Sequence, residues 1–211
     1  MLSEYSDFKV GVVQFPGTNC ERETHMAIKR SGMQSDDFFW TQDVSLLDSF
    51  DALVIPGGFS YEDRGRSGLI AAKLPVMKKI AELAKRGVPI LGICNGAQVL
   101  VESGLVPGFS NDELACALTE NERRLSDGTL LGQGYINNWC HVKFDENMQA
   151  GAFGNIQGLL RVPFAHAEGK FIIPDAVYNL MLEHKVPMFR YCDENGKDAS
   201  HYPDNPNGSC H

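Results

Sequence analysis

Short apolar runs alternate with amphipathic stretches along the first half of the chain. Apolar runs of about four to eight residues between turn residues are typical of buried strands, and a period of about 3.6 residues is typical of helices. The runs predict strands at Phe8–Phe15, Phe38–Trp40, Asp51–Ile55 and Val88–Ile93. Helices are predicted near Cys20–Ser31, from about Gly68 to Arg86, and after Cys94. This alternation favours an α/β fold with a mostly parallel central sheet and helices on both faces.

Beyond Val106-Pro107-Gly108 the apolar segments become shorter. They predict antiparallel strands at 114–119, 135–139 and 142–144, with a charged turn region near 120–127. Further strands are predicted at 159–166 and 186–191, and a helix at 174–184. A chain of 211 residues suits one domain, which we expect to span residues 8–211.

Two Asn-Gly dipeptides predict turns near the end of the chain. Asn195-Gly196 predicts a hairpin with a return strand over Ala199–Tyr202, whereas Asn207-Gly208 predicts a turn with no strand after it. A turn that leads to no strand suggests that the polypeptide continues in its relatives. A disordered polar terminus is the alternative.

Composition and charge narrow the functional class. The hydrophobic fraction of 43% and the charged fraction of 22% are ordinary for a soluble globular protein, and no apolar run approaches the roughly 20 residues of a membrane span. The first residues lack the basic flank and apolar run of a signal peptide, so we expect a cytoplasmic protein. A net charge of −8 without basic patches argues against nucleic-acid binding, which needs a positive surface.

The cysteines and histidines show no metal-binding pattern. The six cysteines form no C-x-x-C pair, which disfavours both a zinc site and a disulfide scaffold, so reduced thiols are expected. The six histidines include no H-E-x-x-H, and Cys140-His141 alone is too little to hold a metal ion.

One cysteine stands between two glycines where a strand is expected to give way to a helix. In Gly92-Ile93-Cys94-Asn95-Gly96, small residues on either side of Cys94 allow a sharp turn that leaves its side chain exposed. The dipole and free N–H groups of a helix N-terminus favour the thiolate, which is the nucleophilic form. Cys94 is therefore the candidate nucleophile, and a buried structural thiol is the alternative.

Two other turns also follow predicted strands. Ligands gather at the carboxyl ends of parallel strands, so Pro16-Gly17-Thr18-Asn19, Pro56-Gly57-Gly58 and Cys94 are expected to share one cleft. Backbone N–H groups at Gly58 and Asn95 would then be candidates for an oxyanion hole beside the nucleophile.

A thiolate nucleophile usually needs a base and a group that orients the base. In an extended chain, His166 and Glu168 would lie on one face and have the right chemistry, which makes them weak candidates. The alternative, which we prefer, is a pair of loop-end side chains in a cleft wall or an interface.

Five motifs occur in order along nearly the whole chain: Pro16-Gly17-Thr18-Asn19-Cys20, Pro56-Gly57-Gly58-Phe59-Ser60-Tyr61, Gly92–Gln98, Ala165-His166-Ala167-Glu168-Gly169 and Asn205-Pro206-Asn207-Gly208-Ser209. Together they resemble the class I (triad) glutamine amidotransferases, which have a flavodoxin-like fold. Within that class they resemble the glutaminase subunits of phosphoribosylformylglycinamidine synthase, an enzyme of purine biosynthesis.

The resemblance implies a reaction and roles for individual residues. Cys94 would attack the carboxamide of L-glutamine, form a glutamyl thioester and release ammonia, after which water frees glutamate. Gly57, Gly58 and Asn95 would lie at the oxyanion and glutamine site. Gln98 matches a family position that contacts bound glutamine. The alternative is a glutamine on the helix face that packs near the sharp turn at Cys94, here called the elbow.

The resemblance also implies partners. The ammonia would pass to a synthetase subunit, assembled with a small accessory subunit, that uses ATP and Mg²⁺ to convert phosphoribosylformylglycinamide to the amidine. Because this chain contains no G-x-x-x-x-G-K-[ST] loop, we assign ATP chemistry to the partner and expect no cofactor or metal here.

Two departures from the family pattern stand out. In the family, the triad histidine and glutamate belong to a His-Pro-Glu element beyond Asn205–Ser209, and no His-Pro-Glu occurs in this chain, so we expect a C-terminal truncation relative to the family. His166-Ala167-Glu168 matches a different, earlier family element. Glu62 stands where many members have glycine.

Two other functions remain open. The first is a truncated, non-catalytic glutaminase-like subunit that binds but lacks the base. The second is a different cysteine-elbow hydrolase or thiol sensor on the same fold class, because a fold does not determine a function.

Overall fold

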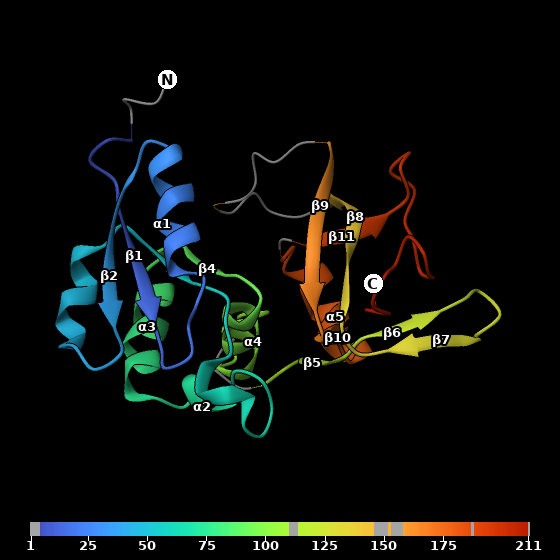
Figure 1. Ribbon diagram of the computed structural model, residues 1–211, viewed down its shortest axis with the longest axis horizontal. Helices are drawn as coiled ribbons and strands as arrows, with labels where there is room; N and C mark the ends of the chain where they lie inside the picture. The colour runs from blue at the N-terminus through green and yellow to red at the C-terminus, as the bar shows by residue number, and fades with distance from the viewer. Residues whose placement is uncertain (1–4, 110–113, 146–151, 153–157, 187, 211) are drawn as a thin grey trace. The chain divides into compact units, whose positions relative to one another are not determined.

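The computed structural model describes residues 5–109, 114–145, 152, 158–186 and 188–210 (Figure 1). The chain forms two compact units, Met1–Leu114 and Ala115–His211, and each is described by itself. One domain over residues 8–211 stays a prediction.

The first unit is built on a four-stranded sheet in the order β2-β1-β3-β4. Its strands are β1 (Lys9–Gln14), β2 (Gln34–Phe39), β3 (Ala52–Ile55) and β4 (Ile90–Gly92). Every neighbouring pair is parallel, which confirms the α/β fold predicted from the alternating pattern.

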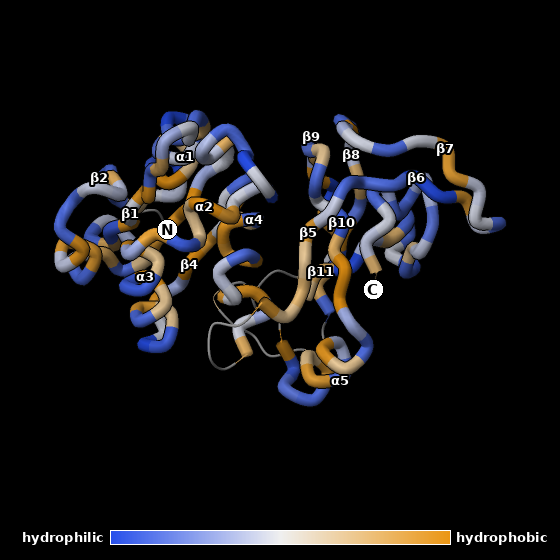
Figure 2. The backbone as a smooth tube through the Cα atoms, turned by 90° about the horizontal axis from the view of Figure 1, so that it is seen from below, coloured by the Kyte–Doolittle hydropathy of each residue, from blue (hydrophilic) through white to orange (hydrophobic). Residues whose placement is uncertain are grey.

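Helices cover both faces of this sheet. Side chains alternate along each strand, so each face carries apolar residues against which a helix can pack. They are α1 (Glu21–Arg30), α2 (Leu69–Ala72), α3 (Pro75–Lys85) and α4 (Asn95–Glu102), with the short 3-10 helices η1 (Val44–Ser49) and η2 (Ser60–Asp63). On one face, Val10, Val12 and Val54 pack against Ile28 of α1. On the other face, Val13 and Leu53 join a larger core with residues of η1, α2, α3 and α4. Figure 2 shows hydrophobic stretches along α2 and α4.

The single helix predicted from Gly68 to Arg86 is two helices. Leu74 is extended, with φ −70° and ψ 150°, and Pro75 occupies the first turn of α3. A proline disfavours helical geometry in the residue before it, and its missing N–H costs nothing at a helix start. The break therefore lies immediately before Pro75.

The described residues of the second unit form three small antiparallel sheets, as the change in pattern predicted. Its strands are β5 (Ala117–Glu120), β6 (Glu122–Arg124), β7 (Leu130–Gln133), β8 (Ile136–Phe144), β9 (Leu159–His166), β10 (Glu168–Ile172) and β11 (Phe189–Cys192), and its helix is α5 (Asp175–Glu183). β10 pairs with β5, β6 with β7, and β8 lies between β11 and β9. The segments predicted at 135–139 and 142–144 fall in one strand, because β9 pairs with β8 without a break from Ile136 to Lys143.

One prediction in this unit was right only in part, and another was wrong. The region 120–127 was predicted as a turn; a turn does form at Ser126 and Asp127, but Glu122–Arg124 forms a strand that pairs with β7. The expected return strand at 199–202 is reduced to a single bridge between Cys192 and Asp198. Beyond that bridge, the Tyr202 N–H donates to the Arg124 carbonyl, so the chain pairs elsewhere. The two Asn-Gly turns do form, with φ of 81° at Gly196 and 77° at Gly208.

No helix in the described ranges is long and apolar enough to span a membrane. Over the same residues, no group of three or more His, Cys, Asp or Glu side chains is arranged to hold a metal ion.

Candidate functional site

Cys94 occupies the sharp turn between β4 and α4. It is the N-cap residue of α4, its side chain is exposed, and its φ and ψ are 53° and −112°. A non-glycine residue in such a conformation costs about 1–3 kcal/mol and is found mainly at functional sites. The strand, turn and helix predicted around Cys94 are therefore present, with the thiol at the positive end of the helix.

The two glycines that flank Cys94 allow this turn to pack tightly. A Cβ atom added to Gly92 would lie 2.6 Å from the Gly96 carbonyl oxygen. A Cβ atom added to Gly96 would collide with the carbonyl oxygen of Ile55 in β3. Both contacts are with backbone, which cannot rotate away, so only glycine fits at either position.

The turns that follow β1 and β3 are joined by backbone hydrogen bonds. The N–H groups of Asn19 and Cys20 donate to the Gly57 carbonyl at 3.2 and 3.3 Å, and Phe59 N–H donates to the Gly17 carbonyl at 2.9 Å. A Cβ atom added to Gly57 would lie 3.3 Å from Cys94 Cβ and 3.4 Å from Cys20 Sγ. The three predicted segments therefore meet at the carboxyl ends of β1, β3 and β4.

The backbone N–H groups of Gly58 and Asn95, near the elbow, make no hydrogen bond within the described residues. Asn95 is the first residue of α4, where N–H groups have no partner within the helix. Both groups are thus free to donate to an oxyanion.

The side chains of Asn95 and Gln98 are buried and bonded to each other. Nδ2 of Asn95 donates to Oε1 of Gln98 at 2.9 Å. The two residues are 4% and 8% exposed, so neither side chain is open to solvent. This contact agrees with Gln98 packing near the elbow, and a contact between Gln98 and glutamine stays a prediction.

The loop after Gly58 is strained. Tyr61, Glu62 and Asp63 have φ of 55°, 58° and 51°, a left-handed conformation that costs non-glycine residues about 1–2 kcal/mol each. Glu62, expected to stand in place of a family glycine, is thus at a position that glycine would adopt without strain. Its carboxylate pairs on the surface with Arg64 at 2.7 Å.

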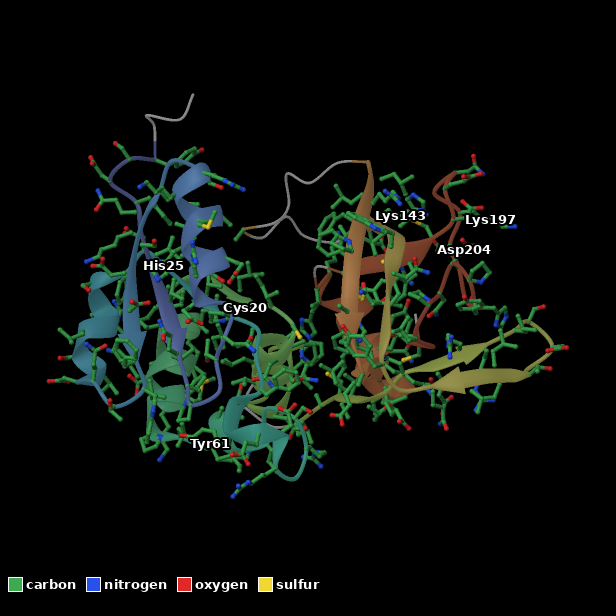
Figure 3. All side chains as sticks on the ribbon, viewed as in Figure 1. Cys20, His25, Tyr61, Lys143, Lys197 and Asp204 are labelled. Carbon is green, nitrogen blue, oxygen red and sulfur yellow. The ribbon has the colours of Figure 1, made fainter. Side chains whose placement is uncertain are left out.

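Cys20 is a second thiol near Cys94 that was not predicted as a site residue. Figure 3 shows it at the start of α1, with Tyr61 in the η2 loop. Burial raises the pKa of the Cys20 thiol, and the negative charge of Glu23 raises it further. Cys20 is therefore a neutral thiol at pH 7. The signal that could have identified it is its place directly after the first strand's turn.

His166 and Glu168 lie in the second unit on different strands. His166 ends β9 and pairs with Ile136, whereas Glu168 begins β10 and pairs with Glu120. The chain bends at Ala167, so the expected extended run with both side chains on one face does not form. A catalytic role for either residue stays a prediction.

The surroundings of His166 are polar but enclosed. Its Nδ1 lies 3.1 Å from Nδ2 of the buried Asn121, which also donates to the His166 carbonyl at 2.7 Å. Burial lowers the pKa of His166, which favours the neutral imidazole.

Comparison with known proteins gives consistent matches. Residues 7–211 match the model of the CobB/CobQ-like glutamine amidotransferase domain. The phosphoribosylformylglycinamidine synthase subunit PurQ of Methanothrix thermoacetophila is 42% identical over 205 residues, which cover 95% of this chain and 77% of that protein. The PurQ subunit of Methanocaldococcus jannaschii is 37% identical over 202 residues, 95% of this chain and 79% of that protein. The structure of PurLQS from Thermotoga maritima matches with a TM-score of 0.61 and 30% identity, over 80% of this chain and 71% of that one.

Proposed function

The chain belongs to the family of glutamine amidotransferases that includes the PurQ subunits, and on this premise we propose that Cys94 hydrolyses glutamine for purine biosynthesis. The ammonia is delivered to a synthetase subunit that converts phosphoribosylformylglycinamide to phosphoribosylformylglycinamidine. The observation that carries the proposal is the strained turn at Cys94, with the loop of Gly57 and Gly58 packed against it.

The reaction begins when the Cys94 thiolate attacks the carboxamide carbon of glutamine. The carbonyl oxygen becomes negatively charged, and the N–H groups of Gly58 and Asn95 stabilise it in the tetrahedral intermediate. The C–N bond then breaks, the proton that the Cys94 thiol gave up passes to the departing nitrogen, ammonia leaves, and a glutamyl thioester remains. Water attacks the thioester, releases glutamate and returns the thiol.

Gly57 and Gln98 complete the proposed glutamine site. Gly57 leaves room beside Cys94, because any side chain there would lie against both Cys94 and Cys20. Gln98, one turn along α4, orients Asn95 and is the proposed family contact to glutamine. The base that activates Cys94 is left unassigned, with His166 and Glu168 as weak candidates.

The partners follow from the same premise. We propose that the chain assembles with a synthetase subunit and a small accessory subunit in the cytoplasm, and that ATP and Mg²⁺ act on the synthetase. The match to PurLQS supports the synthetase, because that structure has PurQ in a complex.

The direct test is glutamate release from glutamine by the protein assembled with its synthetase. Cys94→Ala should reduce the rate by about 10⁴-fold or more, since loss of a nucleophile removes the covalent route. Cys210→Ser is the matched control, because a hydroxyl can keep the hydrogen bonds that Cys210 makes with Ile173 and Phe171. Equal rates for wild type and Cys94→Ala would refute the proposal.

A reactive glutamine analogue separates the proposal from a subunit that only binds. Modification of Cys94 together with turnover supports the enzyme. Modification without turnover supports a non-catalytic glutaminase-like subunit. Modification by peptides or oxidants but not by the glutamine analogue supports another thiol function.

A further inference from the structure

We propose that the side chain of Asn95 is a positioning group that holds the Gly58–Asp63 loop, and through it the Gly58 N–H, in register with Cys94. This inference rests on the proposed function, in which the N–H groups of Gly58 and Asn95 bind the oxyanion. It assigns to Asn95 a task separate from its backbone N–H.

The buried amide of Asn95 accepts one hydrogen bond from a neighbour and donates two. Oδ1 accepts the Ser60 N–H at 3.0 Å, and Nδ2 donates to Oδ1 of Asp63 at 3.1 Å and to Oε1 of Gln98 at 2.9 Å. Two of these three bonds reach the loop, one at Ser60 and one at Asp63. A residue at the start of α4 therefore bridges the nucleophile's helix and the loop after β3.

The loop needs such a bridge because its conformation is unfavourable by itself. Three consecutive non-glycine residues, Tyr61, Glu62 and Asp63, are left-handed. Strain of this kind persists only where the surroundings determine the backbone. Tyr61 N–H is held by the Pro16 carbonyl at 2.8 Å, and Asn95 holds the residues on either side of Tyr61 and Glu62.

The same contacts set the direction of the Gly58 N–H. On the N-terminal side, the Gly57 carbonyl accepts hydrogen bonds from Asn19 and Cys20. On the C-terminal side, Phe59 N–H donates to Gly17 and Ser60 N–H donates to Asn95. Glycine has no side chain to restrict its own rotation, so these neighbours determine where its N–H points. Asn95 thus supplies one oxyanion donor and fixes the other relative to it.

A purely structural role for Asn95 makes different predictions. It would lower the amount of folded protein or the reactivity of Cys94 in general. If Asn95 has a positioning role, its substitution lowers the rate of the step that needs an oxyanion hole. Simple alkylation of the Cys94 thiol continues at its usual rate, because alkylation develops no oxyanion.

The test uses three variants of the protein assembled with its synthetase. Asn95→Leu keeps the size of the side chain and removes every hydrogen bond. Asn95→Asp keeps the acceptor for Ser60 and places a carboxylate against Asp63. Asn95→Asp combined with Asp63→Asn restores a hydrogen bond between the two positions with donor and acceptor exchanged. Asn195→Asp, the same chemical change in an exposed turn, is the control.

The kinetic result expected is a loss of about 10²-fold in kcat for glutamine hydrolysis in the Leu and Asp variants, with little change in KM. The double variant should recover most of that loss, and Asn195→Asp should match wild type. Alkylation of Cys94 by iodoacetamide should be unchanged in Asn95→Leu, which adds no charge beside the thiol, and in Asn195→Asp. Equal losses in hydrolysis and alkylation, or no recovery in the double variant, would overturn the proposal.

Hydrogen exchange of the backbone over residues 57–63 gives a readout that needs no catalysis. The Asn95→Leu variant should exchange faster there and not in β1, since the loop loses two of its ties. Unchanged exchange would show that Asn95 does not hold the loop. If wild-type protein released no glutamate from glutamine, the proposed function would fail, and the exchange data would still decide whether Asn95 positions the loop.

Discussion

Each of the two units is stabilised by a different kind of internal contact. In the first unit, apolar side chains on both faces of a parallel sheet form extensive buried clusters, including Val13, Leu53 and Ile80. Among the described residues of the second unit, the buried members of the apolar cluster are Ile136, Cys140 and Phe164. Buried asparagines bind its strands and terminal segment instead, namely Asn121, Asn205 and Asn207.

This difference shows where the molecule tolerates backbone strain. Of the described non-glycine residues with positive φ, Tyr61, Glu62, Asp63 and Cys94 lie in the proposed site of the first unit. The fifth, Lys185, directly follows the C-cap of α5, a position where left-handed residues are common. A closely packed apolar scaffold can offset several kcal/mol of local strain, and the proposed chemistry is located in the unit with the larger buried apolar clusters.

The largest effect is expected from filling the tightest contact of the first unit. Gly96→Ala should lower the free energy of unfolding by about 3 kcal/mol, because its Cβ would meet the Ile55 backbone. Urea unfolding measures this. Gly57→Ala is the matched control, since its Cβ would meet neighbours at 3.3 Å and beyond and should cost much less. Equal costs for the two variants would contradict a packing limit specific to the elbow.

A smaller loss of folding stability is expected from removing one buried hydrogen-bonding side chain of the second unit. Asn207→Ala should cost about 2 kcal/mol, because the Gly169 carbonyl and the Ser209 N–H would lose their buried partner. The same urea titration applies. Asn138 is an exposed asparagine that accepts a hydrogen bond from its neighbour Trp139, and Asn138→Ala should change stability by less than about 0.5 kcal/mol. A neutral Asn207→Ala would show that the second unit does not depend on its buried amides.

The smallest effect is a dependence on pH in the second unit. Hydrogen bonds from Arg124 and then from Lys170 lower the pKa of Glu122 from 4.5 to about 2. A carboxyl whose pKa is lower in the folded state stabilises the fold above pH 4.5, and this contribution is lost as the pH falls toward 2. Glu122→Gln should therefore flatten the decline of the urea midpoint over this range. If the decline of the urea midpoint were unchanged, other carboxyl groups would be its cause.

Much of the first unit could be predicted because its signals are local. The strands β1, β3 and β4 follow from short apolar runs, and the turn at Cys94 follows from its two glycines. The break before Pro75 was also present in the sequence, and the prediction of one long helix overlooked it. The second unit was predicted less well, because strands such as Glu122–Arg124 carry no apolar alternation.

The sequence by itself determined the fold class, the family and the candidate nucleophile, since periodicity, glycine spacing and ordered motifs are all properties of neighbouring residues. Only the tertiary structure decided how the site is held. The bond from Ser60 to Asn95 spans 35 positions, and the bond from Gly169 to Asn121 spans 48. Such pairings depend on how strands and loops meet in space. No local sequence pattern indicates which distant residue an asparagine side chain will bond.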